Sequence, residues 1–191
     1  MSGRFHETQT PEGDALTALM LETFRLNGRL LAAGDRLVAP IGLTSARWQV
    51  LGAIAMAGRG APVAHIARDM GLTRQSVQRV VDVMAAEGLV GFAANPHHRR
   101  AKLVVLTAHG RATYDAAILR HVGWSNGLAD GLVADGLSAN DIVGATALMR
   151  TLVARLEAAL APGAETGPQA EPDAGPEPSP GAGGEAAPST A

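Results

Sequence analysis

The sequence predicts a mostly helical fold in which long terminal helices flank a central module of two short helices and a β-hairpin. Hydrophobic residues occupy 47% of the 191 positions but aromatic residues only 3%, a composition that favours helices packed through aliphatic side chains over a β-sandwich. Apolar residues recur at helical spacing near both ends of the chain. Between them, residues 62–106 alternate short apolar segments with glycine and polar turns, which predicts the central module.

The first helix is expected from Asp14 to about Val38, a segment without proline. Residues at helical spacing along it are Leu16, Leu19, Met20, Thr23, Leu26, Leu30 and Leu31. A second helix is expected after Thr44 or Ser45, since either hydroxyl can cap it, and it should end in the glycine-rich region around residues 58–60.

Two short helices joined by a tight turn are expected between Pro62 and Gly88. Proline is tolerated at the start of a helix, and one apolar face of the first helix is formed by Val63, Ile66, Ala67 and Met70. Gly71 is expected to adopt the positive φ that ends this helix, and Leu72 to fill the corner. Thr73 then caps the second helix.

The second of these helices has an apolar side and a polar side. Val77, Val80, Val81 and Met84 fall at i, i+3, i+4 and i+7, which marks the buried side. Gln75, Arg79 and Asp82 therefore point outward, with Arg74 and Gln78 on the flanks. Because glutamine pairs with adenine and arginine with guanine in the major groove, this face is a candidate for reading DNA bases. A solvated helix face is the alternative for this segment taken alone.

The segment after Gly88 predicts a β-hairpin with a strongly basic turn. Strands are expected at residues 89–92 and 102–106, and Thr107 is expected to cap the helix that follows. Positive or titratable side chains gather at the turn, namely His97, His98, Arg99, Arg100 and Lys102. Such crowding is costly unless an anion meets it. The hairpin is therefore expected to be a wing that contacts the DNA backbone or a narrow minor groove, with a solvated loop as the alternative.

The charge distribution supports a nucleic-acid partner. The whole chain carries a formal net charge of −2, but residues 59–111 contain eight lysine or arginine residues against three acids, a local charge of +5. Residues 112–191 contain three arginines against ten acids, a local charge of −7. A basic patch in the middle of the chain is the electrostatic signature of nucleic-acid binding.

A last helix is expected after Ser138, because Asp141 follows at the spacing of a capping box. Its apolar stripe is formed by Ile142, Ala145, Met149, Leu152, Val153, Leu156 and Leu160. Together, the first and last helices carry more apolar surface than the central module can cover. A symmetric homodimer built from both ends of the chain is therefore expected.

The expected domain runs from residue 14 to 160, with dimerisation and support helices in 14–58 and 107–160 and the helix-turn-helix and wing in 62–106. Residues 1–13 are expected to be disordered. Residues 161–191 hold seven prolines, five acids and no basic residue, which predicts a disordered acidic tail. That tail would serve either as a solubilising end or as an electrostatic competitor for the DNA-binding surface.

Several functional classes are disfavoured. The absence of cysteine excludes disulfides, thiolate metal ligands and direct thiol redox sensing. No apolar run is long enough to span a bilayer, and no signal-peptide core is found, so a cytoplasmic protein without a membrane partner is expected. His97 and His98 are adjacent rather than four residues apart and lack a nearby carboxylate, which disfavours a metal site. Because the motifs GxGxxG, GxSxG and the P-loop are missing, neither catalysis nor a cofactor is expected.

Three blocks of the sequence resemble the MarR family: LTSARWQVL at 43–51, LTRQSVQRVVDVMAAEGLV at 72–90 and NPHHRRAKLVVLTAHG at 95–110. The resemblance covers about residues 16–160 and implies a winged helix-turn-helix dimer. It also implies that Thr73, Arg74, Gln75, Ser76, Gln78 and Arg79 enter the major groove, and that His97, His98, Arg99, Arg100 and Lys102 act at the wing. Family members often carry an aspartate before the two wing arginines, where this chain has His98. The imidazole would serve either as a neutral acceptor or as a charged phosphate contact.

The resemblance further implies a transcriptional regulator of a palindromic operator in double-stranded DNA, a repressor released by a small aromatic or phenolic ligand. The alternative is a winged helix used for architectural DNA binding or protein contact, without a ligand response. Groups able to hold an aromatic anion are Arg25, Arg29, His65, Trp48 and Trp124. The two tryptophans are expected instead in the core or at an interface, and His65 at the surface or in contact with a phosphate, so no ligand site is assigned.

Overall fold

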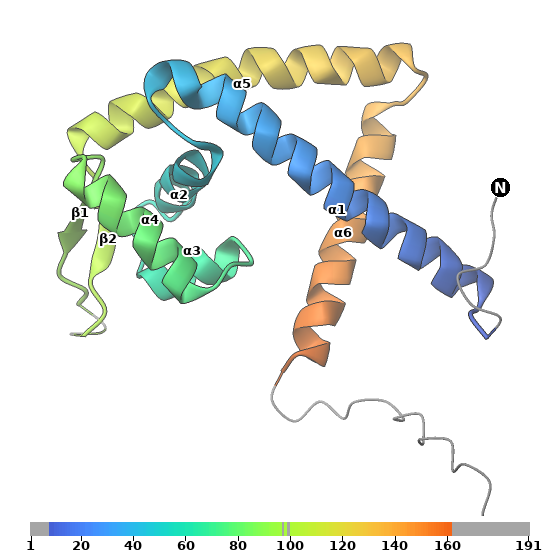
Figure 1. Cartoon of the computed structure of the whole chain (residues 1–191), viewed down its shortest axis with the longest axis horizontal. Coiled ribbons are helices and arrows are strands. Elements are labelled where there is room, and N and C mark those ends of the chain that lie inside the picture. Colours follow the sequence, from blue (N-terminus) through green and yellow to red (C-terminus); the bar gives the residue numbers. More distant parts are fainter. Residues whose placement is uncertain (1–7, 97, 99, 162–191) are drawn as a thin grey trace, which may run out of the picture. The chain divides into compact units, whose positions relative to one another are not determined.

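The computed structural model describes residues 8–96, 98 and 100–161. The described residues divide into two compact units, one up to Leu132 and the other from Val133 onward. The elements are α1 (Pro11–Val38), a 3-10 turn η1 (Ala39–Ile41), α2 (Ser45–Met56), α3 (Val63–Asp69), α4 (Arg74–Ala86), β1 (Val90–Ala93), β2 (Leu103–Leu106), α5 (Ala108–Ala134) and α6 (Ala139–Ala159) (Figure 1). The predicted mostly helical fold with a two-stranded hairpin is confirmed. Among the described helices, none is both long and apolar enough to cross a membrane.

Side-chain caps set the starts of the first two helices. Helix α1 begins at Pro11, three residues before the expected start, because the Thr10 hydroxyl accepts a hydrogen bond from the Gly13 amide at 3.1 Å. At α2, the cap is Thr44 rather than Ser45, the other residue that the sequence allowed, and its hydroxyl accepts from the Arg47 amide at 3.4 Å. Both caps are hydrogen bonds between residues three positions apart, so a hydroxyl residue just before a helical segment indicates a cap.

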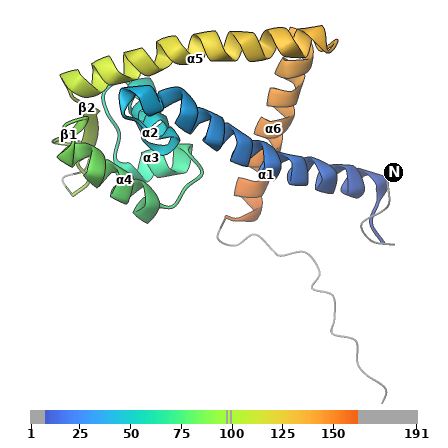
Figure 2. The same cartoon turned by 45° about the horizontal axis from the view of Figure 1, so that its top comes forward.

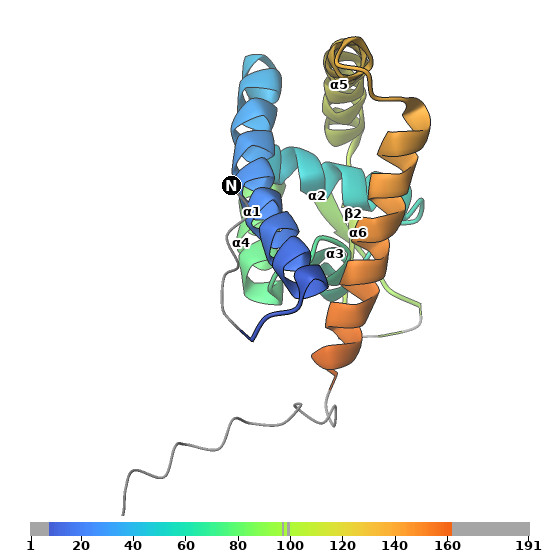
Figure 3. The same ribbon diagram turned by 90° about the vertical axis from the view of Figure 1, so that its right-hand side faces the viewer.

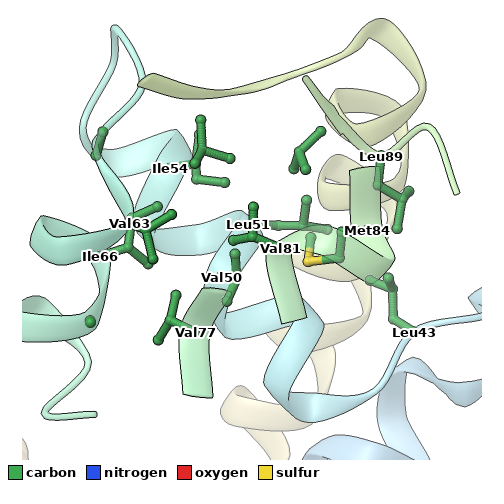
Figure 4. Close-up of a cluster of buried hydrophobic side chains, with 14 of the residues drawn as sticks. Leu43, Val50, Leu51, Ile54, Val63, Ile66, Val77, Val81, Met84 and Leu89 are labelled. Carbon is green, nitrogen blue, oxygen red and sulfur yellow. The ribbon is translucent and has the colours of Figure 1, made fainter. Parts of the chain in front are cut away.

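Helix α2 lies at the centre of the first unit, where it contacts α1, α3, α4 and β2. The core around it is aliphatic and includes Leu43, Val50, Leu51, Ile54, Val63, Ile66, Val77, Val81, Met84 and Leu89 (Figure 4). Of the four residues predicted for the buried side of α4, Val77, Val81 and Met84 are buried, and Val80 is partly buried and packs against the core. Since α4 packs on α2 through these residues, its opposite side faces outward.

The turn between α3 and α4 matches the prediction in two of three respects. Gly71 has a φ of 65°, and the Thr73 hydroxyl accepts a hydrogen bond from the Ser76 amide at 3.2 Å. The expectation that Leu72 fills the corner is wrong, because this residue is 48% exposed. Its contribution is through the backbone, where its amide donates to the Ala67 carbonyl at 2.8 Å, while the buried side chains of Ile66 and Val77 occupy the interior.

Strands β1 and β2 form an antiparallel hairpin in which Val90 pairs with Leu106 and Ala93 with Leu103. Figure 2 shows this hairpin beside α4. A further bridge joins Ala61, just before α3, to Val104 in β2. Thr107 caps α5 as predicted: its hydroxyl accepts from the Gly110 amide at 2.9 Å and donates to the Gly88 carbonyl at 2.6 Å. The base of the hairpin is thus tied to both neighbouring helices.

Helix α6 makes up most of the described part of the second unit and forms a single uninterrupted helix (Figure 3). The predicted capping box is present. The Ser138 hydroxyl accepts from the Asp141 amide at 3.3 Å, and the Asp141 carboxylate accepts from the Ser138 amide at 2.7 Å. None of the helix residues is buried, although the apolar stripe runs along its length.

The capping box makes the stability of α6 depend on pH. Hydrogen bonds from the Ser138 hydroxyl and then from the Ser138 amide lower the pKa of Asp141 below its usual value of 3.8. A lowered pKa in the folded state stabilises the helix above the unfolded-state pKa, and this stabilisation is lost as the pH falls through the folded-state pKa. An Asp141→Asn variant should therefore be less helical than the wild type at pH 7 and indistinguishable from it in strong acid. Circular dichroism as a function of pH measures this, and an equal difference at every pH would contradict it.

Candidate nucleic-acid interface

The first two turns of α4 present a polar surface. Residues Thr73, Arg74, Gln75, Ser76 and Arg79 are exposed, and Gln78 is half-buried. The Gln78 amide nitrogen donates a hydrogen bond to the Asp82 carboxylate at 2.8 Å, which fixes the orientation of its side chain and leaves the carbonyl oxygen and a second N–H available. This part of the helix therefore offers donors and acceptors of the kind that recognise base edges.

The far end of α4 is held in place by an ion pair. The Arg47 guanidinium of α2 lies 2.9 Å from the Glu87 carboxylate, and the Arg47 side chain is only 24% exposed. Partial burial makes such a pair less screened than a surface pair. Together with the apolar contacts of Val77, Val81 and Met84, it fixes α4 against α2, so that the polar surface is carried on a rigid element.

At the wing, His98, Arg100 and Lys102 are exposed, as predicted. Two backbone hydrogen bonds shape the turn: the His98 amide donates to the Asn95 carbonyl at 3.3 Å, and the Ala101 amide donates to the His98 carbonyl at 3.0 Å. The other two predicted wing residues, His97 and Arg99, lie outside the described residues.

Two grooves bring α4 and the wing together. The smaller, with a volume of about 310 Å³, is lined by Arg74 and Gln78 of α4 and by Arg100 and Lys102 of the wing. The larger, with a volume of about 700 Å³, is called the basic groove below; its polar and charged lining includes Arg59, His65, Arg74, Asn95 and His98, and its apolar lining includes Pro62, Pro96 and Leu103. Arg74 lines both grooves, so Arg74 and Gln78 share a surface with the predicted wing residues His98, Arg100 and Lys102. The other predicted residues of the helix line neither groove, namely Thr73, Gln75, Ser76 and Arg79.

The positive charge of this surface is only partly compensated by the acids nearest in sequence. Two of the three acids between residues 59 and 111 have cationic partners elsewhere, since Asp69 lies 4.0 Å from Arg68 and Glu87 pairs with Arg47. The third, Asp82, accepts a hydrogen bond from the neutral Gln78 amide and keeps its negative charge. Among the described residues, no ion pair involves Arg59, Arg74, Arg79 or Arg100. Cations without carboxylate partners attract a polyanion more strongly than paired ones do.

Arg59 belongs to this surface, although sequence reasoning did not select it as a site residue. It follows α2 and lies 39 positions before His98, yet both side chains line the basic groove. The cause is the bridge between Ala61 and Val104, which holds the loop after α2 against β2. The only sequence signal for Arg59 was its place in the basic segment. His65, expected at the surface, is exposed and lines the same groove.

An aromatic cluster lies in the same unit. The ring centroid of His121 in α5 is 5.2 Å from that of Trp48 in α2 and 5.7 Å from that of Trp124. Trp48 packs against the core, as expected, and Trp124 is half-buried. The Nδ1 atom of His121 is buried and has no hydrogen-bond partner within the described part of the chain. The sequence pointed to the two tryptophans but gave no reason to single out this histidine.

Comparisons with known proteins agree with this arrangement. A sequence profile described as the MarR family matches residues 41–101, which span α2 to the wing. The protein Rv2011c of Mycobacterium tuberculosis is 38% identical over 117 residues, covering 61% of this chain and 80% of that protein. The transcriptional activatory protein BadR of Rhodopseudomonas palustris is 29% identical over 99 residues, covering 51% of this chain and 57% of BadR.

Solved structures extend the similarity beyond the matched segment. The M. tuberculosis transcriptional regulator MosR, in a complex with DNA, matches with a TM-score of 0.55 and 27% identity, covering 71% of this chain and 96% of MosR. CouR from Rhodococcus jostii RHA1, bound to p-coumaroyl-CoA, matches with a TM-score of 0.60 and 25% identity, covering 70% of this chain and 90% of CouR. With the sequence profile and the arrangement of α3, α4 and the wing, these similarities show that the chain belongs to the MarR family of winged helix-turn-helix transcription regulators.

Proposed function

We propose that this protein is a homodimer that binds a palindromic site in double-stranded DNA and represses transcription until a small aromatic or phenolic ligand releases it. The observation that carries the DNA-binding part is the continuous surface on which exposed α4 residues meet wing cations that have no ion-pair partner in the described chain. A helix in the major groove and a cationic wing on the flanking backbone fit such a surface.

In this proposal the residues divide into two groups. Base edges are contacted by Thr73, Arg74, Gln75, Ser76, Gln78 and Arg79, because α4 presents them from its first two turns. The sugar-phosphate backbone or a narrow minor groove is contacted by the wing, through His97, His98, Arg99, Arg100 and Lys102. At position 98 the imidazole replaces the aspartate often found in the family, and its place in the basic groove beside Arg59 and Arg74 favours a phosphate contact.

The homodimer is supported by apolar surface on the terminal helices. Helix α1 exposes Leu16, Met20, Leu21, Phe24, Leu26, Leu30 and Leu31, and helix α6 exposes Ile142, Val143, Leu148, Met149, Val153 and Leu156. Isolated helices are marginal in water and gain most of their stability from packing an apolar face. A second copy of the chain is the occupant that would also supply a second α4 for a palindromic site.

The ligand response is supported by chemistry rather than by an observed site. The cluster of Trp48, His121 and Trp124 combines aromatic faces with a buried imidazole nitrogen that has no partner among the described residues, which suits an aromatic acid. CouR, a structural relative, is bound to p-coumaroyl-CoA. The direction of regulation needs its own measurement, since the relative BadR is named an activator.

Binding to DNA upstream of the protein's own gene tests the proposal. Affinity for that fragment and for a random duplex should be measured by fluorescence anisotropy at several salt concentrations, since the salt dependence separates phosphate contacts from base contacts. We expect a specificity ratio of about 10³ or more at physiological salt. A ratio near one would favour the alternative of an architectural or protein-interaction module. In vitro transcription, with and without a panel of aromatic carboxylates, then measures repression and release.

The dimer proposal predicts that a charge on the apolar stripe of α6 separates the subunits. A Val153→Asp variant should shift the mass measured by analytical ultracentrifugation from two chains toward one, because a buried carboxylate without a partner is costly. Thr151→Asp is the matched control, since it adds the same charge at an exposed position on the opposite side of the helix. A wild-type chain that is monomeric at micromolar concentration would refute the dimer.

A further inference from the structure

We propose that the acidic segment 162–191 binds the basic groove of its own protein and competes with DNA for it, which raises the preference for specific over random DNA. This inference rests on the proposed function, because the groove is part of the surface assigned to DNA. The proposal is based on two features: the described lining of the groove has four cationic or titratable side chains and no carboxylate, and the same chain carries a strongly acidic segment.

The groove suits an extended acidic and proline-rich peptide. Arg59, His65, Arg74 and His98 provide donors for carboxylates. Pro62, Pro96 and Leu103 provide apolar contacts between them. Neither Arg59 nor Arg74 forms an ion pair with any carboxylate in the described ranges, so no such pair has to break first.

The acidic segment supplies the complementary charge. It contains Glu165, Glu171, Asp173, Glu177 and Glu185 and no basic residue, and its acids alternate with prolines in the stretches Glu-Pro-Asp at 171–173 and Pro-Glu-Pro at 176–178. Proline before and after an acid keeps a peptide extended and lowers the entropy lost on binding. The segment has too little apolar content to form a core of its own.

The acidic segment has thirty residues, and this length sets how far it can reach. Thirty residues span at most about 100 Å when fully extended, and a flexible chain of that length has an average end-to-end distance of about 30 Å. Tethering gives the segment an effective concentration that can reach the millimolar range. A contact that is weak in isolation therefore competes measurably with DNA.

Competition of this kind acts unequally on different DNA sequences. Binding to random DNA is almost entirely electrostatic, whereas binding to a specific site adds base contacts that carboxylates do not mimic. The acidic segment should therefore weaken random binding more than specific binding. Its effect should disappear at high salt, because salt screens both the segment and the phosphates.

The affinity test uses the full-length chain with all five acids neutralised, as Glu165→Gln, Glu171→Gln, Asp173→Asn, Glu177→Gln and Glu185→Gln. We expect affinity for random duplex to rise on the order of 10-fold at 50 mM salt and to change by less than about twofold at 300 mM. Affinity for the specific site should rise less. The matched control neutralises five exposed acids elsewhere, Glu12, Asp115, Asp130, Asp135 and Glu157, for the same change in net charge. An equal gain in this control would show a net-charge effect and overturn the proposal.

A second measurement detects the contact without DNA. Because the chain has no cysteine, Ser179→Cys provides a unique position for a nitroxide label. At low salt the label should broaden the amide NMR signals of Arg59, His65 and Arg74, and neutralising the other acids of the segment should abolish the broadening. Unchanged groove signals would overturn the proposal even if the protein binds a specific site. Broadening in a protein that shows no sequence preference would refute the proposed regulator and leave the intramolecular contact standing.

Discussion

A Gly110→Ala variant is expected to lose about 1–3 kcal/mol of folding free energy, and more if the backbone cannot shift. Gly110 is buried in the first turn of α5, where an added Cβ would overlap the carbonyl oxygen of Leu89. That oxygen has little freedom to move, because it accepts hydrogen bonds from the Thr107 amide and hydroxyl, both at 3.2 Å. Relief of the overlap would therefore separate α5 from the base of the wing.

Gly123→Ala is the matched control for this variant. Gly123 lies in the same helix, but a Cβ there meets no atom within 4 Å. Alanine is favoured over glycine inside a helix by up to about 1 kcal/mol, so this substitution should leave stability unchanged or raise it. Urea denaturation at one fixed protein concentration measures both variants. Equal stability of Gly110→Ala and the wild type would show that α5 does not approach Leu89 this closely.

Arg79→Ala and Arg100→Ala are expected to weaken DNA binding in different ways. Arg79 is exposed on α4, and loss of its proposed base contact should cost about 1–3 kcal/mol at the specific site and relax the preference at one base pair. Arg100 lies at the wing and lines the smaller groove, so its loss should weaken all sequences together and reduce the salt slope by about one per subunit. Anisotropy titrations against the specific site, single-base variants and random duplex distinguish the two.

Arg120→Ala is the control for this pair, since Arg120 is an exposed cation of α5 that lines neither groove. It should change the affinity much less than Arg79→Ala does at the specific site. If Arg79→Ala weakened specific and random DNA by the same factor, as is expected of Arg100→Ala, Arg79 would be acting as a phosphate contact rather than as a base reader.

The local features of the fold could be predicted from the sequence because they depend on residues three or four positions apart. The caps at Thr44, Thr73 and Ser138 are hydrogen bonds from a side chain to an amide three residues ahead. Gly71 ends α3 because it adopts a positive φ, which glycine tolerates. The buried side of α4 follows from the spacing of its valines and methionine, and the polar face of the candidate site follows from the same spacing.

Other features were decided by segments far apart in the chain. Arg59 joins the basic groove because Ala61 pairs with Val104, His121 lies between two tryptophans from α2 and α5, and Gly110 is required because Leu89 approaches it. Leu72 is a further example. Its apolar side chain predicted burial in the corner between α3 and α4, but it is exposed, and buried side chains of other residues occupy the interior. The sequence by itself determined which segments become helices and the hairpin, and which face of α4 is polar. Only the tertiary structure decided which side chains from different segments share a surface. The physical reason is that contacts between distant segments depend on how their shapes pack together, and the spacing of residues within one segment does not reveal this.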